Sequence, residues 1–213
     1  MQQTLIELSA LIQRGRAKQV GELVTKALSE GIDPQTILTD GMISAMSEVG
    51  DKFKKNEIHV PEVLIAARAM NSALAVLRPE LIKAGVEPVG KAVICTVEGD
   101  CHDIGKNLVK MMMEGAGIEC IDLGVDVGSD RIIEAVKESG AKLVCLSALL
   151  TTTMMSQKKI IDDLKTAGLR DKVKVMVGGA PVTQGFADEI GADAYSPDAA
   201  SAAQKAIELL KSF

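Results

Sequence analysis

Aromatic residues and histidines are scarce in this chain of 213 residues, which has no tryptophan, one tyrosine and two histidines. Its formal net charge is −5 and no basic run is visible, which argues against nucleic acid as a partner. No apolar run reaches the roughly 18 residues that a membrane span requires. The first ten residues are amphipathic and contain Glu7, unlike a signal peptide, so we expect a cytoplasmic protein.

The four cysteines lack the paired spacing of a zinc site. Cys95, Cys120 and Cys145 fall in expected strands or at strand ends, so we predict reduced thiols in a reducing compartment. Cys101 is the exception, because it neighbours His102 in a loop and we expect it to be exposed.

Hydrophobic spacing separates a helical half from an alternating half. Over residues 1–84, apolar residues recur at the spacing of four amphipathic helices, which predicts a helical bundle. One break between helices is Gly31–Pro34, in which Asp33 is expected to cap the next helix and Pro34 to take its first position. Residues 85–91 are rich in turn-forming types and form the expected linker.

Residues 92–213 alternate between short apolar strands and amphipathic helices, which predicts an α/β domain with a parallel sheet covered on both faces. The expected strands are roughly 92–97, 118–123, 142–147, 172–177 and 192–195. The expected helices are roughly 105–115, 129–139, 154–167, 181–189 and 198–212. Five such units fit a flavodoxin-like, Rossmann-like sheet of strand order 2-1-3-4-5, in which the loops after the first and third strands flank one ligand crevice.

The most informative stretch is Glu98-Gly-Asp-Cys-His-Asp-Ile-Gly-Lys-Asn107, which follows the first expected strand. It places Asp100 and His102 two residues apart at the strand end. A carboxylate that accepts one ring N–H fixes the tautomer and leaves the other nitrogen for a metal. An N-capping aspartate beside a solvent-facing histidine is the alternative interpretation.

Other proteins with this type of sheet fit the residues less well. A phospho-receiver requires an aspartate at the end of the third strand, where this chain has Ser147. A flavodoxin usually needs aromatic rings against its flavin, and metal phosphohydrolases assemble several histidine and aspartate ligands. With two histidines in the whole chain, a single protein imidazole suits a metal whose remaining ligands come from a macrocycle.

The motif Asp100-x-His-x-x-Gly, followed by Ser147-x-Leu and Gly178-Gly, resembles the cobalamin-binding domain in which a histidine displaces the lower benzimidazole. With the helical segment before it, the chain is similar to the cap and cobalamin-binding modules of methionine synthase. It is also similar to the corrinoid proteins of anaerobic methyl-transfer systems, which serve methanogenesis or acetogenesis. The stretches 147–154 and 177–184 are most similar to those of methylamine and quaternary-amine systems.

This resemblance implies a cobalamin or related corrinoid in a base-off, His-on state, whose cobalt alternates between Co(I) and methyl-Co(III). It implies that His102 is the lower cobalt ligand, Asp100 its hydrogen-bonded partner, and Thr153 the hydroxyl that extends the pair. The other residues that it assigns to the cofactor are Asp103, Gly105, Ser147, Leu149, Thr151, Gly178, Gly179 and Tyr195 in the sheet half, and Phe53, Val60 and Val63 in the cap. Ordinary bundle core is the alternative for the three cap residues.

The resemblance further implies a methyl carrier that turns nothing over alone. It would accept a methyl group from a substrate:corrinoid methyltransferase, acting on a methylamine, a quaternary amine or a methoxy compound, and pass it to a second, corrinoid:acceptor methyltransferase. A reductive activase would rescue oxidised cobalt. A cobalamin storage or delivery protein, a cobalamin-dependent sensor and a mutase subunit are the alternatives.

Overall fold

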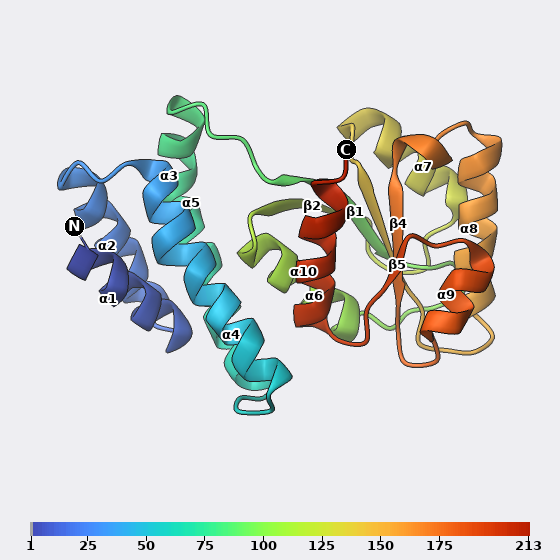
Figure 1. Cartoon of the computed structure of the whole chain (residues 1–213), viewed down its shortest axis with the longest axis horizontal. Coiled ribbons are helices and arrows are strands. Elements are labelled where there is room, and N and C mark those ends of the chain that lie inside the picture. Colours follow the sequence, from blue (N-terminus) through green and yellow to red (C-terminus); the bar gives the residue numbers. More distant parts are fainter. Residues whose placement is uncertain (1) are drawn as a thin grey trace. The chain divides into compact units, whose positions relative to one another are not determined.

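The computed structural model describes residues 2–213, which divide into two compact units (Figure 1). The helical unit comprises the chain up to Pro88 together with Glu114–Gly117, and the sheet unit comprises Val89–Met113 and Ile118–Phe213. A helical region followed by an α/β region with a five-stranded parallel sheet is the fold class that the hydrophobic pattern predicts.

The helical unit contains the four expected helices, the third of which is locally distorted. Its elements are α1 (Gln2–Gln13), α2 (Ala17–Ser29), α3 (Pro34–Thr36), η1 (Ile37–Ile43), α4 (Ser44–Lys54) and α5 (Val60–Lys83). The third helix is a continuous run in which the π-helical segment η1 joins α3 to α4. Its start is as predicted, because the Asp33 carboxylate accepts the Thr36 N–H at 3.0 Å and Pro34 takes the first helical position.

The longest helix, α5, packs against α1, α2 and α4 and is central to this unit. Its buried side chains are Val63, Ala66, Ala67, Ala69, Met70, Ala73, Leu77 and Leu81. By length and composition α5 is the one helix among residues 2–213 able to cross a membrane, a criterion that the core helix of a soluble protein also meets. The sequence-based expectation was that no apolar run reaches the length of a membrane span, and α5 corrects it, because this helix meets the criterion of length and composition.

The sheet unit has five parallel strands in the order β2-β1-β3-β4-β5, which confirms the predicted order. The strands are β1 (Gly90–Thr96), β2 (Ile118–Asp122), β3 (Leu143–Ser147), β4 (Lys174–Gly178) and β5 (Ala194–Tyr195). The helices are α6 (Ile104–Gly115), α7 (Ser129–Ser139), α8 (Met154–Thr166), the 3₁₀ turn η2 (Arg170–Lys172), α9 (Gln184–Ile190) and α10 (Ala199–Leu210). Because Gly90 already pairs with Ile118, the sheet begins inside the segment expected to be linker.

Helices cover both faces of this sheet (Figure 1). The helices α7, α8 and α9 lie over one face, where Val93, Val144 and Val175 belong to a continuous apolar core, and α6 and α10 lie over the other. In a parallel sheet, residues in register on neighbouring strands point to the same face. The carboxyl ends of all five strands meet at one edge, and their loops carry the predicted site residues.

The cysteines lie where their strand positions predict. Cys95 and Cys145 are buried, Cys120 is partly buried and Cys101 is exposed. Burial raises the pKa of Cys95 to about 12 and that of Cys145 well above its ordinary value. Both side chains therefore remain protonated thiols that pack as small apolar groups.

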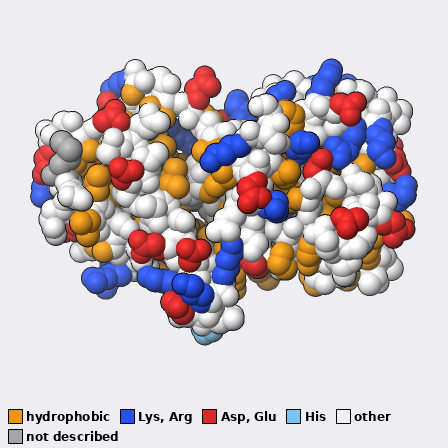
Figure 2. Space-filling model, in the orientation of Figure 1, with side chains coloured by type: hydrophobic (Ala, Val, Ile, Leu, Met, Phe, Trp, Pro, Cys, Tyr) orange, Lys and Arg blue, Asp and Glu red, His pale blue; other side chains and the backbone are white. Residues whose placement is uncertain are grey.

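Charged side chains of both signs are interspersed over the face of the molecule shown in Figure 2. This mixture agrees with the modest net charge of −5.

Candidate functional site

The loop between β1 and α6 holds one imidazole against a buried carboxylate. The His102 Nδ1 atom lies 2.7 Å from Asp100 Oδ1, so the hydrogen bond expected from their spacing is present. The His102 backbone N–H donates to the same oxygen at 3.1 Å. The Asp100 side chain is fully buried, whereas the His102 side chain is 52% exposed. One ring nitrogen is therefore held by the protein while the rest of the ring stays accessible.

The second carboxylate oxygen of Asp100 is held by the loop that follows β3. Asp100 Oδ2 accepts the Thr153 hydroxyl at 2.7 Å and the Leu149 N–H at 2.7 Å. Thr153 is itself buried, and its hydroxyl oxygen also lies 3.1 Å from the Leu150 carbonyl oxygen. The loops after the first and third strands therefore meet at Asp100, as the predicted strand order requires.

These contacts keep Asp100 ionised. Burial alone raises the pKa of a carboxyl group, but here the Leu149 and His102 amides, the Thr153 hydroxyl and the His102 ring all bond to the charged form. Together they hold the pKa of Asp100 well below its usual range. An ionised carboxylate oxygen 2.7 Å from Nδ1 is an acceptor for the Nδ1–H, which leaves Nε2 as the unengaged ring nitrogen.

Thr96 and Asp126 also fix the backbone of the His102 loop, and neither was predicted from the sequence. The buried Thr96 hydroxyl donates to the His102 carbonyl at 2.8 Å. Asp126, after β2, accepts the Gly99 N–H at 2.7 Å. Thr96 could have been noticed as a polar residue ending an apolar strand, but nothing in the sequence marks the pairing of Asp126 with a residue 27 positions away.

The remaining sheet residues assigned by resemblance fall on two different faces. Ser147 is in register with Thr96 on one side and Gly178 on the other, so these three share a face. Tyr195 is in register with Val177 and packs against the core beneath α7, α8 and α9. The structure therefore brings Ser147 and Gly178 together and places Tyr195 on the opposite face, and the role of Tyr195 in a cofactor slot stays a prediction.

The glycines in these loops differ in what surrounds them. Gly179 has φ +124°, and a Cβ atom there would lie 1.8 Å from the Ala148 carbonyl oxygen. A Cβ on Gly178 would make an ordinary contact of 3.4 Å with the Ser196 carbonyl, and one on Gly105 would meet open space. Gly179 is thus required by the protein's own backbone, whereas Gly105 is free to border a ligand.

Exposed apolar side chains gather in the loops at this edge of the sheet. They are Ile104 after His102, Val125 after β2, and Leu149 and Leu150 after β3. Asp103 and Thr151 are exposed in the same loops. Apolar side chains exposed at this edge suit a ligand that carries apolar groups.

The structure describes no group of three or more His, Cys, Asp or Glu side chains, within residues 2–213, that could hold a metal ion. A metal bound by His102 would therefore have to bring its other ligands with it. A corrin ring does so through its four nitrogens, and its methyl groups suit the exposed apolar side chains near His102. The residues present fit a corrinoid.

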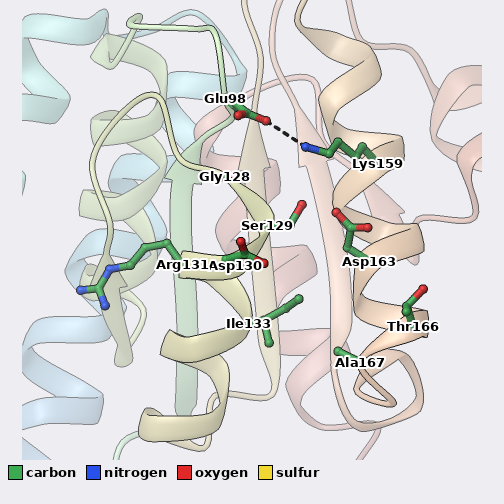
Figure 3. A pocket seen from close by; sticks show the side chains of 10 residues that line it. All are labelled: Glu98, Gly128, Ser129, Asp130, Arg131, Ile133, Lys159, Asp163, Thr166 and Ala167. Atoms are coloured by element: carbon green, nitrogen blue, oxygen red, sulfur yellow. Dashed lines mark hydrogen bonds and ion pairs between the residues drawn. The ribbon is translucent and has the colours of Figure 1, made fainter.

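A cavity of about 610 Å³ lies between α7 and α8 (Figure 3). Its walls carry both charges, with Glu98, Asp130 and Asp163 against Arg131 and Lys159. Glu98 and Lys159 form an ion pair of 3.1 Å, drawn dashed in Figure 3, which ties the start of the His102 loop to α8. This cavity has no histidine among the described residues that line it and is a poorer match for a corrinoid than the edge around His102.

The three cap residues assigned by resemblance are described within the helical unit alone. Phe53 in α4 is half-buried, Val60 at the start of α5 is 36% exposed, and Val63 is fully buried. Val63 therefore has the burial of ordinary bundle core, whereas Val60 is available for a contact. His59 is exposed, and its backbone N–H donates to the Glu62 carboxylate at 3.0 Å. The role of the cap in covering a cofactor stays a prediction.

Gly179→Ala tests the backbone role of that glycine. We expect the substitution to lower the free energy of unfolding of the sheet unit in the apo-protein. The left-handed conformation alone costs roughly 1–3 kcal/mol for a residue with a side chain, and the clash with Ala148 adds to it. Gly105→Ala is the control, because its new methyl group meets open space in a helix and should cause no loss. Equal losses in urea titrations of both variants would contradict the assignment.

The low pKa of Asp100 predicts a pH-dependent contribution to stability. A carboxyl whose pKa is depressed on folding stabilises the protein above its unfolded value of about 3.9, and this stabilisation is lost as the pH falls toward the folded value. Asp100→Asn should therefore lower the free energy of unfolding by on the order of 2 kcal/mol at pH 7, with a difference that shrinks below about pH 4. Urea titrations from pH 7 to well below the unfolded pKa measure it. The exposed Asp103→Asn is the control, and a difference for Asp100→Asn that is independent of pH would contradict the prediction.

Comparisons with known proteins point to the same cofactor. Two family models described as B12 binding domains match residues 90–205 and residues 5–78. The trimethylamine corrinoid protein of Methanosarcina barkeri is 47% identical over 186 residues, which is 86% of each chain. Among solved structures, a cobalamin-binding protein from Desulfitobacterium hafniense DCB-2 matches with a TM-score of 0.80 and 32% identity, over 96% of this chain and 98% of that one.

A second solved structure, the methanol:cobalamin methyltransferase complex MtaBC from Methanosarcina barkeri, contains a chain that matches with a TM-score of 0.86 and 28% identity. The match covers 99% of this chain and 81% of that one. The helical unit and the sheet unit are thus both matched by B12-binding models and by solved relatives. This chain belongs to the family of B12-binding corrinoid proteins.

Proposed function

We propose that this chain is a methyl carrier that binds its corrinoid through His102 and exchanges a methyl group with two methyltransferases. The observation that carries the proposal is a half-exposed imidazole held at Nδ1 by a buried, ionised carboxylate. It lies at an apolar edge of the sheet, where the structure describes no other set of metal ligands in residues 2–213. The identity of 47% with a trimethylamine corrinoid protein supports the same function.

The chain's own residues would bind the cofactor with its lower base displaced. His102 would present Nε2 to the metal, because Nδ1 is engaged by Asp100. Gly105, Ser147 and Gly178 would border the displaced nucleotide tail, since open space or small side chains surround them. Gly179 would contribute indirectly, by allowing the β4 loop to pass close to Ala148.

When bound, the corrinoid supplies a cobalt atom that takes up and gives up a methyl group and changes its need for a lower ligand as it does so. The protein would contribute the hydrogen bond between Asp100 and His102 Nδ1. An Nε2 atom without the metal would take up a proton from solvent, and the Asp100 carboxylate would stabilise the resulting imidazolium. The Thr153 and Leu149 donors keep Asp100 ionised, so Asp100 would act as the acceptor of the Nδ1–H bond.

The partners follow from the same proposal. The structural relative in the MtaBC complex supports docking to a substrate:corrinoid methyltransferase, and the trimethylamine relative favours a methylated amine as its substrate. A corrinoid:acceptor methyltransferase would remove the methyl group, and a reductive activase would restore oxidised cobalt. We place all four proteins in the cytoplasm. A storage protein would bind the corrinoid equally well but would not exchange methyl groups with such enzymes.

His102→Ala tests the ligand assignment. The wild-type protein loaded with a benzimidazole-containing corrinoid should show, in electron paramagnetic resonance of its Co(II) form, nitrogen coupling from an imidazole. His102→Ala should lose that coupling and bind the corrinoid more weakly, because the protein then offers no lower ligand. His59→Ala is the matched control, as the second histidine of the chain. Benzimidazole coupling in the wild type, or unchanged coupling in His102→Ala, would contradict the assignment.

Gly105→Val tests the path of the nucleotide tail. A valine there adds bulk only to open space, so the apo-protein should fold normally. If the tail occupies that space, overpacking of roughly 1–3 kcal/mol should weaken binding of a complete corrinoid about 5- to 150-fold. Cobinamide, which lacks the nucleotide, should bind nearly as before. Gly185→Val is the control, because Gly185 is also the second residue of a helix with open space around it. Equal effects on both ligands would place the tail elsewhere.

Methyl transfer separates a carrier from a store. With a cognate amine methyltransferase and a reductant, label from an isotopically labelled methylamine should appear on the protein-bound corrinoid and move on to an acceptor enzyme over many turnovers. A protein that binds the corrinoid but acquires no label with any amine, quaternary-amine or methoxy-compound methyltransferase would contradict the carrier proposal.

A further inference from the structure

The loop after β2, residues 123–128, is bonded to the His102 loop at two backbone groups, the Gly99 N–H and the Asp100 carbonyl. The Asp126 carboxylate accepts the Gly99 N–H at 2.7 Å, and the Asp126 backbone N–H donates to the Asp100 carbonyl at 2.9 Å. These two bonds hold the backbone from Gly99 to Asp100, just before His102. Neither bond involves the imidazole itself.

The β2 loop is in turn anchored to the sheet and to α6. The Gly124 carbonyl accepts the Thr96 N–H at 3.0 Å, and the Gly124 N–H donates to Asp122 at 2.9 Å. Asp122 is fixed by the buried Lys106 at 2.6 Å and by Lys110 at 3.2 Å. Asp126 therefore contacts the His102 loop from a loop that is itself held in place by the ion pairs of Asp122.

Asp126 adopts a backbone conformation that a side chain normally disfavours. Its φ is +55°, in the left-handed region where glycine is the least costly residue and where Asn and Asp are tolerated best. Its side chain is exposed, so apolar packing does not account for an aspartate here. The bond from the Gly99 N–H is a contact that glycine at this position could not make.

We propose that Asp126 is a positioning residue for His102. By clamping the Gly99 and Asp100 peptide groups, it fixes the place from which the imidazole reaches the metal. This inference rests on the proposed function, since it concerns His102 as a cobalt ligand. A loop whose backbone is fixed would keep the imidazole in position to bind the metal again after it has dissociated.

Three variants separate the side-chain contact from the backbone strain. Asp126→Asn keeps both an acceptor oxygen and a residue that tolerates positive φ. Asp126→Gly relieves the strain but removes the acceptor. Asn56→Gly is the matched control, because Asn56 has φ +57° in the helical unit, where relief of strain should leave the His102 loop unchanged.

Amide hydrogen exchange on the apo-protein gives the first readout. Exchange of the Gly99 N–H should be at least tenfold faster in Asp126→Gly than in the wild type, and close to the wild-type rate in Asp126→Asn and Asn56→Gly. The melting temperature of Asp126→Gly should not fall, because glycine is favoured at this φ. A Gly99 amide that exchanges at the wild-type rate in Asp126→Gly would overturn the proposal.

Electron paramagnetic resonance of the Co(II) corrinoid-loaded variants gives the second readout. The fraction of cobalt with imidazole coupling should fall severalfold in Asp126→Gly and be restored in Asp126→Asn. A wild type without imidazole coupling would overturn the proposed function itself. A wild type with coupling that Asp126→Gly leaves unchanged, or that Asp126→Asn loses as severely, would overturn only the positioning role of Asp126.

Discussion

The site depends on one buried carboxylate. Asp100 is fully removed from water, and an isolated charge in that position would be strongly destabilising. It persists because the amides of His102 and Leu149, the Thr153 hydroxyl and the His102 ring occupy its two oxygens. Those donors come from two loops far apart in sequence, so the same bonds that keep the charge also join the loops after β1 and β3. The joining of these two loops and the orientation of His102 therefore depend on the same carboxylate.

A parallel sheet of order β2-β1-β3-β4-β5 is the scaffold that makes this interaction possible. It places the ends of β1 and β3 side by side and leaves the loop after β2 on the other flank of β1. The His102 loop is thus supported from both neighbours, by Thr153 and Leu149 on one side and by Asp126 on the other. The outer half of the imidazole remains open at an edge lined by exposed apolar side chains.

Much of this architecture could be predicted from the sequence, because it depends on local signals. Apolar runs specified the strands, and the spacing of Asp100 and His102 made their hydrogen bond geometrically natural. The contacts of Asp126 and the clash that reserves Gly179 for glycine could not be predicted, since both depend on backbone conformations set by long-range packing. The face of the sheet on which Tyr195 lies could not be predicted either, because a shift of one residue in strand register moves a side chain to the other face.

The most direct test of the central claim is the Co(II) electron paramagnetic resonance spectrum of protein grown with histidine labelled with the heavy nitrogen isotope. With two histidines in the chain, and His59 removed by substitution, His102 is the sole labelled residue. The account predicts that the nitrogen coupling on cobalt changes from a triplet to a doublet on labelling. A triplet that persists would show that the ligand nitrogen comes from elsewhere and would contradict the account.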